Sequence, residues 1–156
     1  MHASASIASA PVPRIGKRRV RLPGRAYRIT WMTARRRPHF ERLEAARAVV
    51  AAMRAQEARG LVRSMAWVLM PDHLHWLVQL EGEETVDAVL DALRSACEGV
   101  EGTADGAPLW ADDYSVQPLS ARDDIREISR DIVANPLRWG LAASLAEYPH
   151  WDAIWI

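Results

Sequence analysis

Two consecutive apolar runs constrain the fold of this chain more than any other feature of its 156 residues. Residues 62–70 (VRSMAWVLM) and 74–80 (LHWLVQL) are rich in β-branched, aromatic and long aliphatic side chains, which favours strands over turns. Between them stands Pro71-Asp72, a turn-forming pair. The sequence therefore predicts an antiparallel hairpin near the middle of the chain.

The segments on the N-terminal side of this hairpin predict one strand and one helix. Residues 26–33 (AYRITWMT) are β-branched and aromatic with approximate alternation, as in a strand. Over residues 40–59 the apolar side chains recur every three or four positions, which indicates an amphipathic helix that Gly60 ends.

The C-terminal side predicts two more helices and a weak strand. A helix over residues 85–97 should begin with Thr85 as its cap. A second helix over residues 120–134 should have Ser120 as its cap and be limited by Pro136. Between these helices, a strand signal lies at residues 114–119.

The order β-α-β-β-α predicts an α+β fold, a ferredoxin-like sandwich in which helices pack on an antiparallel sheet. We expect residues 1–22 to be a disordered basic tail and residues 23–156 to form a single domain. The longest uninterrupted apolar stretch, residues 65–70, is far shorter than the ~20 residues of a membrane-spanning helix. With no apolar segment typical of a secretory signal and a single cysteine, Cys97, we expect a cytoplasmic location and no membrane partner.

The formal net charge of zero hides a division of the chain into two halves. Residues 1–63 contain fifteen Lys and Arg against three Asp and Glu, and residues 64–156 contain five against seventeen, so the halves carry +12 and −12. A basic tract attracts phosphate, which makes the first half a candidate nucleic-acid surface. The alternative is two solvated halves that neutralise each other. Binding would require the basic residues of the first half to gather on the side that bears His73 and His75.

His73 and His75 are the most informative candidate site residues. On a strand, side chains two positions apart project from the same face, so both imidazoles should point one way while Leu74 and Trp76 point the other. Two imidazoles placed in this way could hold a divalent ion. A His-x-His pair taken alone is better explained as partly exposed strand histidines than as a metal site.

A second candidate group lies in the late helix. Asp131 and Asn135 are four positions apart, so their side chains should share one helix face and could serve one site. The alternative is local, because an Asn before Pro136 is also an ordinary helix terminator.

Several segments resemble the REP-associated tyrosine transposases, a branch of the single-tyrosine HUH transposases. The matching segments, in order, are RLPGRAYRITWMT, AWVLMPDHLHWLVQL, IVANPLRWGL and YPHWDAIW. The resemblance implies a ferredoxin-like domain, often dimeric, that binds hairpin-forming repeats and cleaves and rejoins one DNA strand. It also implies a divalent metal, magnesium with manganese as the alternative, at the positions of His73, His75 and Asn135. Inside a cell, such a protein would associate with the nucleoid when bound to DNA.

The chain departs from this family at the nucleophile. The family's helix reads Tyr-Ile-Val-x-Asn-Pro or close to it, and here Asp131 stands in place of the tyrosine. A carboxylate is a poor substitute, because an acyl phosphate is labile and the negative charge repels a phosphodiester. Three explanations compete: a repurposed or decayed binding protein, takeover of catalysis by Tyr114, or hydrolysis in which Asp131 acts as metal ligand or base.

The leading hypothesis is therefore a single-stranded or hairpin DNA-binding protein of the transposase type that has lost normal strand cleavage. The alternative is an active metal-dependent nickase or transposase whose nucleophile is Tyr114 or water, and a third option is a remnant without a DNA role. Whether the chain is an enzyme stays open at this point. Phosphate contacts are expected from basic residues of the first half, namely Lys17, Arg18, Arg19, Arg21, Arg35, Arg36 and Arg37.

Overall fold

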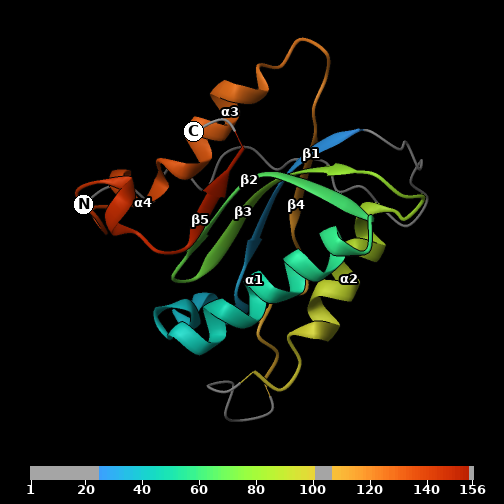
Figure 1. Cartoon of the computed structure of the whole chain (residues 1–156). Helices are drawn as coiled ribbons and strands as arrows, with labels where there is room; N and C mark the ends of the chain where they lie inside the picture. The colour runs from blue at the N-terminus through green and yellow to red at the C-terminus, as the bar shows by residue number, and fades with distance from the viewer. Residues whose placement is uncertain (1–24, 101–106, 155–156) are drawn as a thin grey trace.

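A five-stranded antiparallel sheet forms the centre of the molecule in the computed structural model, which describes residues 25–100 and 107–154 (Figure 1). Its strand order is β4-β1-β3-β2-β5. The strands are β1 (Ala26–Met32), β2 (Val62–Met70), β3 (His73–Leu80), β4 (Ser115–Pro118) and β5 (Trp151–Ala153). The predicted hairpin is the β2–β3 pair, and the weak signal at residues 114–119 is the edge strand β4.

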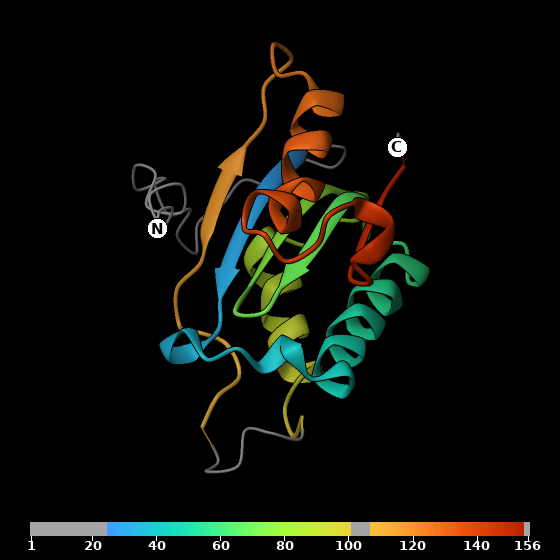
Figure 2. The same cartoon turned by 90° about the vertical axis from the view of Figure 1, so that its left-hand side faces the viewer.

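Helices cover both faces of this sheet. α1 (Leu43–Ala58) and α2 (Val86–Ala96) lie side by side on one face, while α3 (Ile125–Val133) and α4 (Asn135–Arg138) lie on the other (Figures 1 and 2). Short 3-10 turns at Ala34–Arg36, His39–Glu41 and Leu145–Glu147 complete the connections. The first four strands and α1 and α2 have the predicted ferredoxin-like arrangement, and β5 extends the sheet beyond β2.

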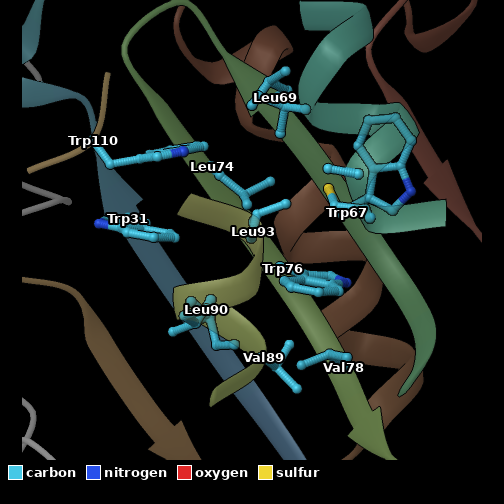
Figure 3. Packing of buried hydrophobic residues seen from close by; sticks show 14 of the residues in the cluster. Trp31, Trp67, Leu69, Leu74, Trp76, Val78, Val89, Leu90, Leu93 and Trp110 are labelled. Carbon is cyan, nitrogen blue, oxygen red and sulfur yellow. The ribbon is translucent and has the colours of Figure 1, made fainter. Parts of the chain in front are cut away.

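The larger hydrophobic core lies between the sheet and the α1–α2 layer. Trp31, Trp76 and Trp110 are completely enclosed there, together with aliphatic side chains of α2 such as Leu90 and Leu93 (Figure 3). Trp31 and Trp110 stack with ring centroids 4.5 Å apart. Strand alternation explains this core, because every second residue of β1 and β3 projects toward α1 and α2.

A smaller core lies on the opposite face, under α3. Ile132 and Val133 of α3 pack there against Val68, Met70 and Leu77 of the hairpin. The strand residues on this face alternate with those of the larger core, so the same hairpin supplies both cores.

Three predicted boundaries were inaccurate. α1 begins at Leu43, because residues 39–41 form a separate 3-10 turn. α3 begins at Ile125 and its cap is Asp124, whose carboxylate accepts bonds from two backbone N–H groups, so Ser120 is not the cap. Pro136 does not stop the helical path, since it stands in the first turn of α4, where its missing N–H costs nothing.

The predicted tail at residues 1–22 lies outside the described residues. Among the described helices, none combines the length and apolar character that crossing a membrane requires.

Candidate functional site

His73 and His75 project from β3 toward the face that α3 and α4 cover, while Leu74 and Trp76 belong to the core on the other face. Their Nε2 atoms are 3.1 Å apart and their rings are nearly perpendicular, at 87°. Both residues are buried, with 1% and 7% of their surface exposed. The expectation that the two imidazoles share one face is confirmed. The Nε2 atom of each ring points toward the other ring.

The Nδ1 atom of each imidazole lies within hydrogen-bonding distance of a polar side chain. His73 Nδ1 lies 2.7 Å from Asp72 Oδ1, and His75 Nδ1 lies 3.2 Å from Thr30 Oγ1. A carboxylate can only accept, so Nδ1 of His73 carries the proton and its Nε2 lone pair faces His75 when the ring is neutral. Carboxylate–histidine contacts of this kind orient and strengthen metal-binding imidazoles.

The environment of His75 keeps this ring uncharged. Burial, joined by the nearby His73 and Arg28, lowers the pKa of His75 to about 3. The ring is therefore neutral at physiological pH, which is the form that can act as a metal ligand.

The distances within the histidine pair fit a shared ion. Two nitrogens that each lie about 2.1 Å from one ion are roughly 3.0–3.4 Å apart, so an ion could replace the proton that the two Nε2 atoms share. In the described part of the chain, no three or more His, Cys, Asp or Glu side chains are placed so that together they could hold a metal ion. The remaining coordination positions would go to a neutral amide, water or a phosphate oxygen, as in an open site of modest affinity.

The side-chain amide of Asn135 bonds to the backbone of the last turn of α3. Its Nδ2 donates to the backbone oxygens of Ile132 at 2.8 Å and of Asp131 at 3.3 Å. Because the nitrogen is committed to the helix, the amide oxygen is the atom that remains for a ligand. The role of Asn135 as a third metal ligand stays a prediction.

Asp131, at the predicted nucleophile position, is bound by two arginines from different elements. Its Oδ2 lies 2.9 Å from Arg28 Nη2 of β1, and its Oδ1 lies 2.7 Å from Arg138 Nη2 of α4. Partial burial would raise the pKa of Asp131, but the bonds from Arg28 and Arg138 outweigh it and hold this pKa below its usual value. The charges of all three residues act on His75, so this ion-pair group borders the histidine pair.

An open pocket of about 540 Å³ lies between β1 and α3 beside this ion-pair group. Next to it, Ser115 and Gln117 of β4 are exposed and share the face of Thr30 and Arg28, since directly paired residues of antiparallel strands point the same way. The pocket is lined by Arg28, Glu127, Ile128, Arg130, Asp131, Ala134 and Arg138. A partly uncovered polar strip of sheet, with Arg28 as its charged residue, therefore adjoins the histidines.

Sequence reasoning missed the three arginines of this pocket. Arg28 stands two positions before Thr30 on a strand, and Thr30 pairs with His75, so the period of two places Arg28 on the histidine face. Arg138 follows Asp131 by seven positions, the spacing of one helix face. The signals were present, but they require the strand register and the continuation of the helix past Pro136.

The predicted phosphate contacts at residues 35–37 lie on an exposed loop next to the β2–β3 turn. Arg35 and Arg36 have positive φ values of 57° and 56°, which residues with a side chain rarely adopt. Arg36 Nε donates to Asp72 Oδ2 at 2.9 Å, so one carboxylate joins this arginine to His73. Arg36 is therefore brought to the site, and Arg35 and Arg37 are exposed beside it.

Tyr114 is not brought to the histidine pair. It packs against the larger core on the opposite face, with its ring edge toward Trp31, and its hydroxyl donates to Asp87 of α2. Burial and the Asp87 carboxylate raise its pKa far above the usual value, which makes a poor nucleophile. This placement argues against Tyr114 as the replacement for the missing tyrosine.

The basic residues of the first half do not all gather on the histidine face, as the charge division had suggested for a nucleic-acid surface, but divide between the two faces of the sheet. Arg28 and Arg36 lie at the site, whereas Arg47 and Arg54 belong to α1 on the opposite side of the sheet. The second half contributes Arg130 and Arg138 to the site. Lys17, Arg18, Arg19 and Arg21 lie outside the described residues.

Comparisons with known proteins point to one kind of fold. No protein-family model matches the chain, and no curated protein matches it by sequence. Among solved structures, a REP-associated tyrosine transposase bound to a REP hairpin superposes with a TM-score of 0.68 and 19% identity, covering 88% of this chain and 82% of that one. A candidate transposase from Deinococcus radiodurans R1 has a TM-score of 0.52 and 21% identity, covering 78% of this chain and 97% of that one. The chain thus has the α+β fold of a REP-associated tyrosine transposase.

Proposed function

We propose that this chain binds single-stranded or hairpin-forming DNA through a transposase-type fold, holds a divalent ion at His73 and His75, and does not carry out covalent strand transfer. The observation that carries this proposal is the meeting of the histidine pair and an arginine-lined pocket on one face of the sheet.

The DNA part of the proposal rests on fold and charge. A protein of the same fold is known in complex with a REP hairpin. On the histidine face of this chain, Arg28, Arg36 and Arg138 come from three different elements. Guanidinium groups spread in this way suit a phosphate backbone that runs across the face, and they would position DNA without reading its bases.

The metal part rests on the geometry and protonation of the imidazoles. His73 and His75 would supply the two nitrogen ligands, and the amide oxygen of Asn135 is the candidate third ligand. When bound, a magnesium or manganese ion would neutralise charge on a phosphate and polarise its oxygens. Asp72 and Thr30 would keep the rings oriented toward that ion.

Impairment of cleavage follows from the groups that occupy the nucleophile position. Asp131 offers a carboxylate, whose negative charge repels a phosphodiester and whose acyl phosphate would be labile, and in the free protein both of its oxygens are bound by guanidinium groups. Tyr114 lies on the other face of the sheet. A DNA strand bound at the pocket would therefore meet no side chain able to form a covalent link.

The decisive experiment incubates the protein with a labelled DNA hairpin that has a single-stranded extension, in the presence of magnesium, and reads mobility shift and covalent adduct together. We expect a shift without an adduct. An adduct that disappears in Tyr114→Phe, or nicking that disappears in Asp131→Asn, would establish the nickase alternative instead. Absence of any shift at low salt would remove the DNA-binding proposal.

The metal is tested separately, because it need not depend on DNA. Titration of Mn²⁺ followed by electron paramagnetic resonance should show one site that His75→Gln weakens at least about tenfold. His150→Gln is the matched control, since His150 lies in a different pocket, with Arg47, Arg54 and Trp151. Equal Mn²⁺ binding by wild type and His75→Gln would exclude the histidine pair as the site.

A further inference from the structure

The ion-pair group at Asp131 has the chemistry of a filled anion site. One anion with two oxygens receives one guanidinium on each oxygen, from Arg28 at 2.9 Å and from Arg138 at 2.7 Å. A phosphate offers the same pattern, since arginine forks bind carboxylates and phosphates through equivalent contacts. The side chain of residue 131 thus sits where a phosphate oxygen pair would be held.

The arginines of this group remain within reach of solvent. The side chains of Arg28, Arg138 and Asp131 are 28%, 52% and 39% exposed, so an incoming anion can approach them. Arg130 is exposed and lines the same open pocket, and it adds a third positive charge. Exposed ion pairs are weak, which makes this internal pair exchangeable.

Arg138 has a second anchor that does not involve the carboxylate. Its Nη1 donates to the backbone oxygen of Asp131 at 3.1 Å. Because of this bond, the guanidinium would keep its position at the pocket after the carboxylate had moved away. The site is therefore built to accept an external anion without first being reassembled.

We propose that Arg28, Arg130 and Arg138 form a phosphate-binding pocket, and that Asp131 occupies it in the free protein as a built-in anion which a phosphate of a nucleic-acid strand displaces. The phosphate chemistry stands on the arginine geometry, whereas the nucleic-acid source of the phosphate rests on the proposed function. In this arrangement Asp131 weakens binding of every phosphate, so that only a strand also held elsewhere on the face displaces it.

The test compares Asp131→Asn with Glu127→Gln in binding to a fluorescent DNA hairpin with a single-stranded extension. Both substitutions remove one negative charge from the lining of the pocket, but in the described structure Glu127 makes no ion pair with the arginines. We expect Asp131→Asn to tighten binding about three- to tenfold at low salt and to steepen the salt dependence by roughly one phosphate contact. Glu127→Gln should change the affinity less than about twofold.

A double variant makes the result specific to the pocket. Adding Arg28→Gln to Asp131→Asn should abolish the gain, because the released guanidinium is the group that produces it. Equal gains in Asp131→Asn and Glu127→Gln would overturn the proposal in favour of a general charge effect. If both proteins bind the hairpin and Asp131→Asn shows no gain, the proposal is overturned as well.

Inorganic phosphate separates this inference from the proposed function. If neither protein binds the hairpin but phosphate shifts the arginine Nε resonances of Asp131→Asn more than those of wild type, the pocket stands and the DNA proposal falls. If phosphate shifts neither, the pocket proposal falls as well. Should Asp131→Asn fail to fold, as judged by thermal unfolding, Arg138→Gln must weaken hairpin binding while the exposed Arg122→Gln does not; any other result refutes the pocket.

Discussion

The two faces of the sheet are built from the same strands and have opposite characters. Toward α1 and α2, β1 and β3 present Ile29, Trp31, Leu74 and Trp76, all completely buried in the larger core. Figure 3 shows the last three of these side chains. Toward α3, the alternate positions present the charged and polar groups Arg28, Thr30, His73 and His75, together with Ala26 and Leu77 of the smaller core.

This contrast shows that the residues of the main core and those of the candidate site lie on opposite faces of one sheet. A strand with a period of two can dedicate one set of residues to an apolar core and the other to a site without either set disturbing the other. α3 is attached to the polar face by one ion pair, between Asp131 and Arg28, and by the smaller hydrophobic core. We therefore expect stability to depend on the α1–α2 face and ligand binding on the α3 face.

The largest expected effect is on the free energy of unfolding, when one tryptophan on each face of the sheet is replaced by alanine. Trp76→Ala should lower the free energy of unfolding by about 3–5 kcal/mol, because the ring is completely enclosed. Trp139→Ala removes a partly exposed ring of the α3 face and should cost roughly 1–2 kcal/mol. Chemical denaturation of both variants measures this, and equal costs would contradict the division.

Acid should act through the polar face. His75 has its pKa lowered by burial from 6.5 to about 3, so between these values the unfolded state binds the proton that the folded state excludes. Stability should consequently fall as pH drops below 6.5, by up to about 1.4 kcal/mol per pH unit from this group. Urea unfolding at a series of pH values, with His75→Gln as reference, isolates the slope. A wild-type slope equal to that of the variant would show that His75 is not the source.

The helix caps offer a matched pair with about equal energetic cost. Thr85 caps α2 through Ala88 N, and Asp124 caps α3 through the N–H groups of Arg126 and Glu127. Replacing either by Ala should cost about 1 kcal/mol. Of these two variants, only Asp124→Ala should weaken hairpin DNA binding, because α3 carries residues of the pocket and α2 does not. Binding assays below the unfolding transition check this, and weaker binding by Thr85→Ala would argue against it.

The smallest expected effect compares one arginine of each face. Arg28→Gln should weaken DNA binding roughly three- to tenfold at low salt, since Arg28 lines the pocket. Arg94 lies over the Trp31 ring at 4.9 Å on the other side of the sheet, so Arg94→Gln should leave the DNA affinity within about twofold. Fluorescence anisotropy at several salt concentrations measures both. Equal losses would mean that the strand does not select the histidine face.

Much of the architecture follows from local pattern. The apolar runs at residues 62–70 and 74–80 predicted the hairpin, and the period of two predicted that His73 and His75 share a face. Helix boundaries were less accurate around residue 120, because several polar residues there can serve as caps and only the tertiary fold selects Asp124. The sequence predicts a helix end at Pro136, because it does not show that a second helix, α4, follows at once.

The sequence by itself determined the central hairpin, the common face of the two imidazoles and the presence of an aspartate at position 131, because strand periodicity and residue identity are local properties of the chain. Only the tertiary structure decided what Asp131 contacts. Its partner Arg28 stands 103 residues before it, on β1, and its partner Arg138 stands seven residues after it, on α4. Contacts between such distant segments depend on strand register and helix docking, which no local pattern contains.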